Sequence, residues 1–92
     1  MIASVECEFR IYEVKTLKEK RAVLQRVLTR LKQKFNVSAA EIEYQDLWQR
    51  TKIAIVTVNS SQLAAEREVE NTLKFLDSFP EWERLETIIE WL

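Results

Sequence analysis

The side chains best placed to do chemistry in this sequence are glutamates spaced two or four residues apart. Such carboxylates could meet across neighbouring strands as a site for a hard cation or as an acid/base pair. The same spacing is typical of the solvated face of an antiparallel sheet, and we favour that interpretation. The pairs are Glu6 with Glu8, Glu41 with Glu43, and Glu86 with Glu90.

The residue types that the chain lacks exclude most other catalytic sites. It has no histidine, so it offers no imidazole acid/base, no catalytic triad and no histidine metal ligand. It has no glycine, so no glycine-rich phosphate loop can form. Cys7 is the one cysteine, and its position between Val5 and Phe9 favours an inert buried thiol. We therefore expect no enzymatic activity, no cofactor and no metal.

A basic segment is the better candidate for function. Residues 15–34 contain eight lysines and arginines against one acid, Glu19, which is enough charge for several phosphate contacts. Alternatively, this is a solvated helix face that acidic residues 66–70 partly neutralise. Lys20 falls inside the apolar stripe of the predicted helix, so its stem extends to the sheet rim or its charge serves a partner. The cations are Lys15, Lys18, Lys20, Arg21, Arg26, Arg30, Lys32 and Lys34.

A second candidate is the segment Asp46-Leu47-Trp48-Gln49-Arg50, which combines an indole, a guanidinium, an amide and a carboxylate. It falls at a predicted connection between strands, where binding residues are often found. Two interpretations remain open. Trp48 caps the core while Asp46 pairs with Arg50, or the segment binds a partner. Base stacking on the sheet itself is disfavoured, because Tyr12 is the only outward aromatic residue expected on the two central strands.

The elements that position these residues follow from hydrophobic periodicity. Residues 2–14 alternate as a strand with one buried face, and segments 40–45, 52–58 and 84–92 also have the pattern of strands. A capping box at Thr16 and Glu19 begins a helix, and Asn36 is expected to end it in a left-handed conformation. A second helix should follow the Asn59-Ser60-Ser61 cluster and end near Ser78, before Pro80.

The order of these elements, β-α-β-β-α-β, predicts an α/β (α+β) ferredoxin-like sandwich in a single domain of residues 1–92. Its four-stranded antiparallel sheet should have two helices on one face and leave the other face open. We expect that open face to be mostly acidic with apolar spots. The residues expected on it are Ser4, Glu6, Glu8, Arg10, Tyr12, Glu41, Glu43, Glu86, Ile88, Glu90 and Leu92.

Charge and hydropathy indicate the cellular compartment of the protein. Residues 1–52 carry 11 Lys and Arg against 7 Asp and Glu, whereas residues 53–92 carry 3 against 8, so the chain is basic at one end and acidic at the other. The N-terminus lacks the basic start and apolar core of a signal peptide, and the densest apolar stretch, 53–58, is too short to span a bilayer. We expect a cytoplasmic protein without a membrane partner.

Taken together, these features resemble the YlxP-like family of small bacterial proteins. The resemblance rests on Leu17-Lys18-Glu19-Lys20-Arg21, on Phe35-Asn36-Val37-Ser38, and on Asp46-Leu47-Trp48-Gln49-Arg50 before a β-branched strand. It implies a ferredoxin-like fold in a cytosolic bacterial protein without an established activity. Genes of the family commonly lie among those for translation and ribosome maturation, which implies an RNA or ribosomal role by association only.

Two functional hypotheses result. The first is a non-enzymatic accessory protein that binds RNA or a ribosomal component through the basic helix and the Trp48 connection. The second is a structural module that binds another protein or a second copy, as a homodimer, through the open sheet face or the edge strand ending at Trp91 and Leu92. The candidate binding residues are Lys15, Lys18, Lys20, Arg21, Arg26, Arg30, Trp48 and Arg50.

Overall fold

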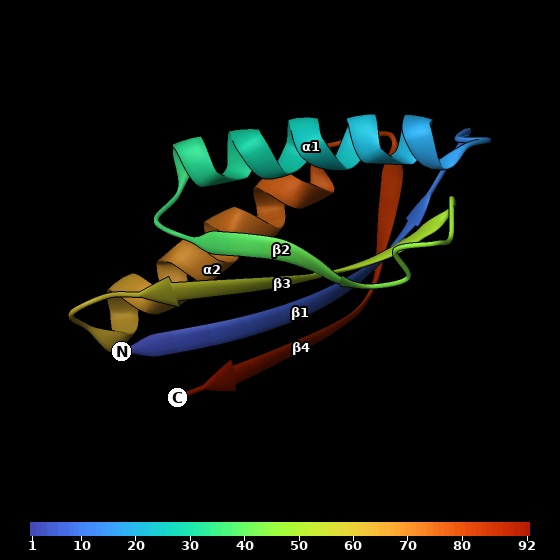
Figure 1. The fold of residues 1–92 in the computed structure, drawn as a ribbon. Helices are drawn as coiled ribbons and strands as arrows, with labels where there is room; N and C mark the ends of the chain where they lie inside the picture. Colours follow the sequence, from blue (N-terminus) through green and yellow to red (C-terminus); the bar gives the residue numbers. More distant parts are fainter.

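Strand β1 lies inside a four-stranded antiparallel sheet with the order β2-β3-β1-β4. The computed structural model describes residues 1–92, and both helices lie on the same face of the sheet (Figure 1). This is the predicted ferredoxin-like arrangement. Neither helix is long and apolar enough to cross a membrane. The elements are β1 (Ile2–Ile11), α1 (Leu17–Lys34), β2 (Ser38–Glu43), β3 (Arg50–Val58), α2 (Gln62–Asp77) and β4 (Trp82–Trp91).

The core lies between the sheet and the two helices. Alternation along β1 places every second residue from Ala3 to Ile11 in this layer, where all are buried. Val27 and Leu31 of α1 and Leu76 of α2 pack against them. Burying side chains of this size contributes about 1.5–3 kcal/mol each. This buried layer explains why apolar and polar residues alternate along β1 and why each helix has a single apolar stripe.

Trp82, the first residue of β4, closes one end of the core. Its ring stacks on Phe9 with centroids 4.0 Å apart, and its Nε1 donates to the Leu76 carbonyl at 2.8 Å. The register between β1 and β4 shifts between Cys7 and Phe9, and Arg84 donates to the Asp77 carboxylate of α2. Because Trp82 already pairs with Ile11 of β1, β4 begins two residues earlier than the predicted segment 84–92.

The ends of α1 confirm one predicted cap and correct another. Thr16 Oγ1 accepts from the Glu19 backbone N–H at 3.1 Å, as expected, but the Glu19 carboxylate accepts from the N–H of Lys15 instead of Thr16. The prediction of a left-handed Asn36 is wrong, because the helix already ends at Phe35 in an extended conformation. Only Glu13 (φ 60°) and Tyr44 (φ 64°) have positive φ. Asn36 instead donates its side-chain amide to the Val58 carbonyl.

Glu41 does not lie on the open face of the sheet, and that prediction is also wrong. The register between β2 and β3 shifts between Glu41 and Glu43, so strict alternation fails there. Glu41 points to the helix side, where its Oε2 lies 2.9 Å from Lys20 Nζ. Glu43 forms an ion pair with Lys52 of β3 instead, at 3.6 Å. A β-bulge thus separates two carboxylates that the sequence places together.

The open face consists of two unlike halves. Near the chain termini it is apolar, with Ile2, Val56, Val58 and Ile88 all exposed. At the other end of β1 it is charged, and its carboxylates are largely paired with cations, as in the Glu8–Arg50 ion pair. The expected mostly acidic face is therefore only half correct, because β3 contributes cations at one end and valines at the other.

Candidate nucleic-acid interface

The start of α1 and the connection between β2 and β3 lie at the same end of the molecule. Lys20 Nζ donates to the Tyr44 carbonyl at 2.5 Å, and Gln49 Nε2 donates to the Val14 carbonyl at 3.3 Å. The Ile11 N–H also donates to the Gln49 carbonyl. These bonds join segments far apart in the sequence. The two candidate binding regions, predicted separately, thus lie next to each other at one end of the molecule.

Lys20 has an internal position and is not part of that surface. Its side chain is 1% exposed, and its ammonium pairs with Glu41. The Thr51 hydroxyl donates to the same Glu41 oxygen at 2.6 Å, so the buried carboxylate is well satisfied. The expectation that Lys20 contacts a partner directly is therefore wrong. Lys20 ties the first turn of α1 to the strand and loop that precede Trp48.

The other candidate cations of this segment remain exposed on the outer face of α1 and the loop before it. They are Lys15, Lys18, Arg21, Arg26 and Arg30. Arg26 forms an ion pair with Glu81, which precedes β4. Arg30 has no ion pair. The acidic residues 66–70 of α2 do not pair with the cations of α1, and Glu68 accepts from the Asn36 N–H instead. Most of the basic charge is thus free to meet an external anion.

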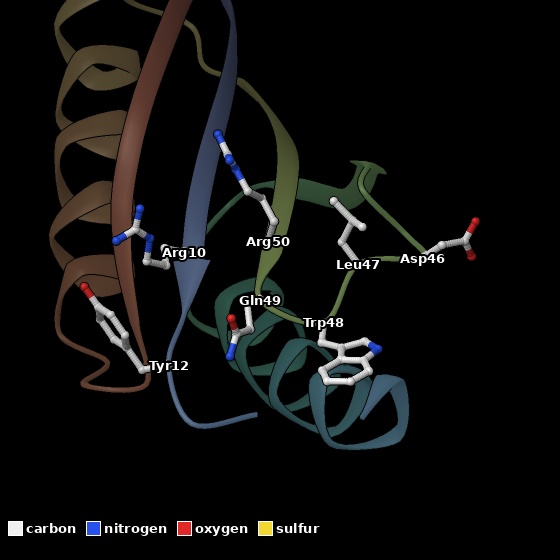
Figure 2. Close-up of a pocket in the computed structure, with 7 residues that line it drawn as sticks. All are labelled: Arg10, Tyr12, Asp46, Leu47, Trp48, Gln49 and Arg50. Atoms are coloured by element: carbon white, nitrogen blue, oxygen red, sulfur yellow. The ribbon is translucent and has the colours of Figure 1, made fainter. Parts of the chain in front are cut away.

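An open pocket of about 700 Å³ lies between the end of β1 and the β2–β3 connection (Figure 2). Trp48 is 50% exposed and projects outward from the connection, so it does not cap the core. Asp46 does not pair with Arg50, which binds Glu8 at 2.6 Å instead. The lining residues are Arg10, Tyr12, Asp46, Leu47, Trp48, Gln49 and Arg50.

Two arginines face each other across neighbouring strands in this pocket. Arg10 of β1 is the direct partner of Arg50 of β3. Like charges directly opposite each other destabilise a sheet, so an anion placed between them would relieve their repulsion. Glu8 neutralises Arg50, whereas Arg10 has no ion pair. The pocket also contains the Asp46 carboxylate, so with Arg50 paired to Glu8 the guanidinium of Arg10 is the one in the pocket without an ion pair.

Arg10 and Tyr12 are the residues of the pocket that sequence reasoning left out of the site. Alternation did assign both to the open face, but nothing local indicates which residue of another strand lies beside them. Tyr12 donates its hydroxyl to Glu83 of β4, and this bond raises the pKa of Tyr12. Only the register between strands brings Arg10 next to Arg50.

No nucleophile or metal site accompanies this pocket. Cys7 is buried on the opposite side of the sheet, and burial raises its pKa from 9.0 to about 11, so the thiolate is scarce at neutral pH. No group of three or more His, Cys, Asp or Glu side chains is close enough to hold a metal ion. What the pocket offers is guanidinium groups for an anion and aromatic rings for stacking.

Comparison with known proteins decides the family. Residues 2–89 match the family described as "Protein of unknown function (DUF503)". The chain belongs to this family. It is also 56% identical over 91 residues to "Uncharacterized protein YlxP" of Bacillus subtilis (strain 168), covering 99% of both chains. The resemblance drawn from the three sequence runs is thereby confirmed.

A solved structure shares the fold of this DUF503 chain. It is a de novo designed protein, Foldit4, with a TM-score of 0.60 and 18% sequence identity, and the match covers 100% of this chain and 99% of that one. At this identity the likeness concerns the fold alone. The DUF503 chain therefore has a backbone topology that an unrelated, designed sequence also adopts.

Proposed function

We propose that this protein is a non-enzymatic RNA-binding accessory protein of the bacterial cytoplasm. The observation that supports the proposal is the cross-strand pair Arg10 and Arg50 beside the half-exposed Trp48. These groups supply what a flexible nucleic acid strand requires, namely cations for phosphates and a ring on which a base can stack. The family resemblance to proteins encoded among ribosome-maturation genes favours structured RNA or a ribosomal component as the partner.

The start of α1 extends this site. Lys15, Lys18 and Arg21 are exposed around the N-terminal turn of the helix, where the helix dipole is already positive. Cations at that end destabilise a helix, so their presence is better explained by an anionic partner than by stability. Lys20 joins α1 to the β2–β3 connection, and Gln49 joins that connection to Val14 in the loop before the helix, so a phosphate backbone could run from the arginine pair to the helix. We propose that it follows this path.

Fluorescence anisotropy with a labelled, structured RNA hairpin tests this function. A protein that contacts about four phosphates should lose affinity with a log–log salt slope near −3. Arg10→Glu should weaken binding about tenfold or more, and Trp48→Ala about fivefold or more, because base stacking is worth about 1–3 kcal/mol. Lys74→Glu is the matched control, since it reverses an exposed charge in the last turn of α2.

Two results would contradict the proposal. One is an affinity that does not change between low and physiological salt. The other is an equal loss of binding in Arg10→Glu and Lys74→Glu, which would indicate that only net charge matters. Thermal melts should show that each variant is folded at the assay temperature, because Arg10 and Lys74 are both exposed.

A further inference from the structure

The second half of β4 has apolar residues exposed on both sides of the strand. Ile89 and Trp91 face the helix side yet are 45% and 42% exposed, and Ile88 is exposed on the open face. Ile89 and Trp91 line a groove of about 380 Å³ between β4 and α2, together with Leu63 and Leu73 of the helix. Monomeric proteins seldom expose apolar side chains this densely unless they bind something there.

β4 is also an edge strand without the usual protection. It pairs with β1 on one side only, and Figure 1 shows its final half at the border of the sheet, away from α1. The segment 88–92 contains a single charge, Glu90, and no lysine or proline. Natural edges usually have such residues because they prevent pairing with another strand. The other edge, β2, is six residues long, and Lys20 of α1 covers its Glu41.

We propose that a second copy of this chain binds this edge, with the two β4 strands antiparallel about a two-fold axis near Ile89. The two sheets then join into one, and the two α2 helices lie side by side over the joint. Strand pairing alone is too small for a stable dimer, which buries about 1,200–2,000 Å² in total. The apolar groove beside the strand supplies the additional contact.

Charge complementarity favours a second copy as the occupant. About an axis at Ile89, Glu90 lies opposite Ile88 of the second copy, so no two carboxylates are directly opposed. On the rim of the groove, Arg67 lies between Glu66 and Glu70 of α2. An antiparallel copy of the helix brings its Arg67 towards these acids, and the exchange is reciprocal. The surface is thus complementary to itself in both strand and helix.

The test is the molar mass of the full chain in solution, by sedimentation equilibrium from about 1 μM to 1 mM. We expect twice the 11.0 kDa of one chain at high concentration. Ile89→Lys should weaken the dimer about 1,000-fold, because the substitution occurs twice at the centre of the interface. Val56→Lys is the matched control, because Val56 is 42% exposed on the open face of β3, away from the β4 edge.

Crosslinking tests the register directly. Ile89→Cys places two thiols opposite each other across the axis, so mild oxidation should give a covalent dimer, whereas Val56→Cys should not. The natural Cys7 is buried and does not interfere. A monomer at 1 mM would overturn the proposal. So would a dimer that Val56→Lys dissociates and Ile89→Lys does not, since that result assigns the contact to the open sheet face.

Discussion

The ammonium of Lys20 lies 2.9 Å from the Glu41 carboxylate, inside the protein, with the lysine almost completely buried. This pair joins the first turn of α1 to the edge strand β2, and the same lysine donates to the Tyr44 carbonyl at the start of the connection that contains Trp48. Tyr44 has a positive φ, which is costly for a large side chain. The buried lysine therefore holds a strained loop at the border of the proposed RNA site.

Lys20→Met should destabilise the protein by about 3 kcal/mol, because it leaves the Glu41 carboxylate without its partner in a mostly buried position. Urea unfolding monitored by circular dichroism measures this change. The double variant Lys20→Met with Glu41→Leu should recover much of the loss, since it removes both charges. If the loss of stability in the double variant equals the sum of the losses in Lys20→Met and Glu41→Leu, the two groups are not coupled.

Thr72→Val should stabilise the protein. The Thr72 hydroxyl is buried in α2 and has no hydrogen-bond partner in the protein, so replacing it with a methyl group of similar shape removes an unsatisfied polar group. We expect a gain of about 1 kcal/mol, or a melting temperature about 4–8 °C higher. Thr57→Val is the control, because the Thr57 hydroxyl donates to the Asn36 carbonyl and its loss should lower stability. The prediction fails if both variants shift in the same direction.

Stability should fall at high pH because of Cys7. Burial raises the pKa of its thiol from 9.0 to about 11, so between these values the unfolded chain loses the proton first. The unfolded state then binds fewer protons, and the free energy of unfolding declines by up to about 1.4 kcal/mol per pH unit. This stabilisation is complete below pH 9 and lost as pH approaches 11.

The comparison of Cys7 with Cys7→Ala isolates this effect, because lysines and tyrosines titrate in both proteins. Chemical denaturation at pH 8, 9, 10 and 11 should show a steeper decline for the unmodified protein. Parallel curves would mean that the thiol titrates alike in the folded and unfolded states. At pH 8 the native thiol should also resist a thiol reagent that labels the unfolded chain.

Arg26 and Arg30 should differ in their effect on RNA binding. Arg26 already pairs with Glu81, whereas Arg30 has no ion pair. Arg30→Ala should therefore reduce the magnitude of the salt slope by about 0.7–0.9, and Arg26→Ala should change it less. Reversing both charges, Arg26→Glu with Arg30→Glu, should weaken binding to all RNA sequences alike. Unchanged affinity in that double variant would exclude the middle of α1 from the interface.

The fold could be predicted because its signals are local. Alternation along residues 2–11 and the apolar stripe of residues 17–34 follow from the geometry of one strand and one helix, and the order of six elements leaves few topologies open. The cap at Thr16 is equally local. The positions that failed, Asn36 and Glu41, are those where an early helix end or a β-bulge breaks the simple period.

The proposed binding surface depends on contacts between distant residues, which the periodicity of the sequence does not predict. Residue types alone identified the cationic helix and the Trp48 connection, since charge and aromatic character need no coordinates. Only the tertiary structure decided that Lys20 is buried against Glu41 while Arg10 lies beside Arg50. Both relationships join residues that are at least twenty positions apart in the sequence, and strand register and helix placement, which depend on packing of the whole core, determine which distant side chains meet.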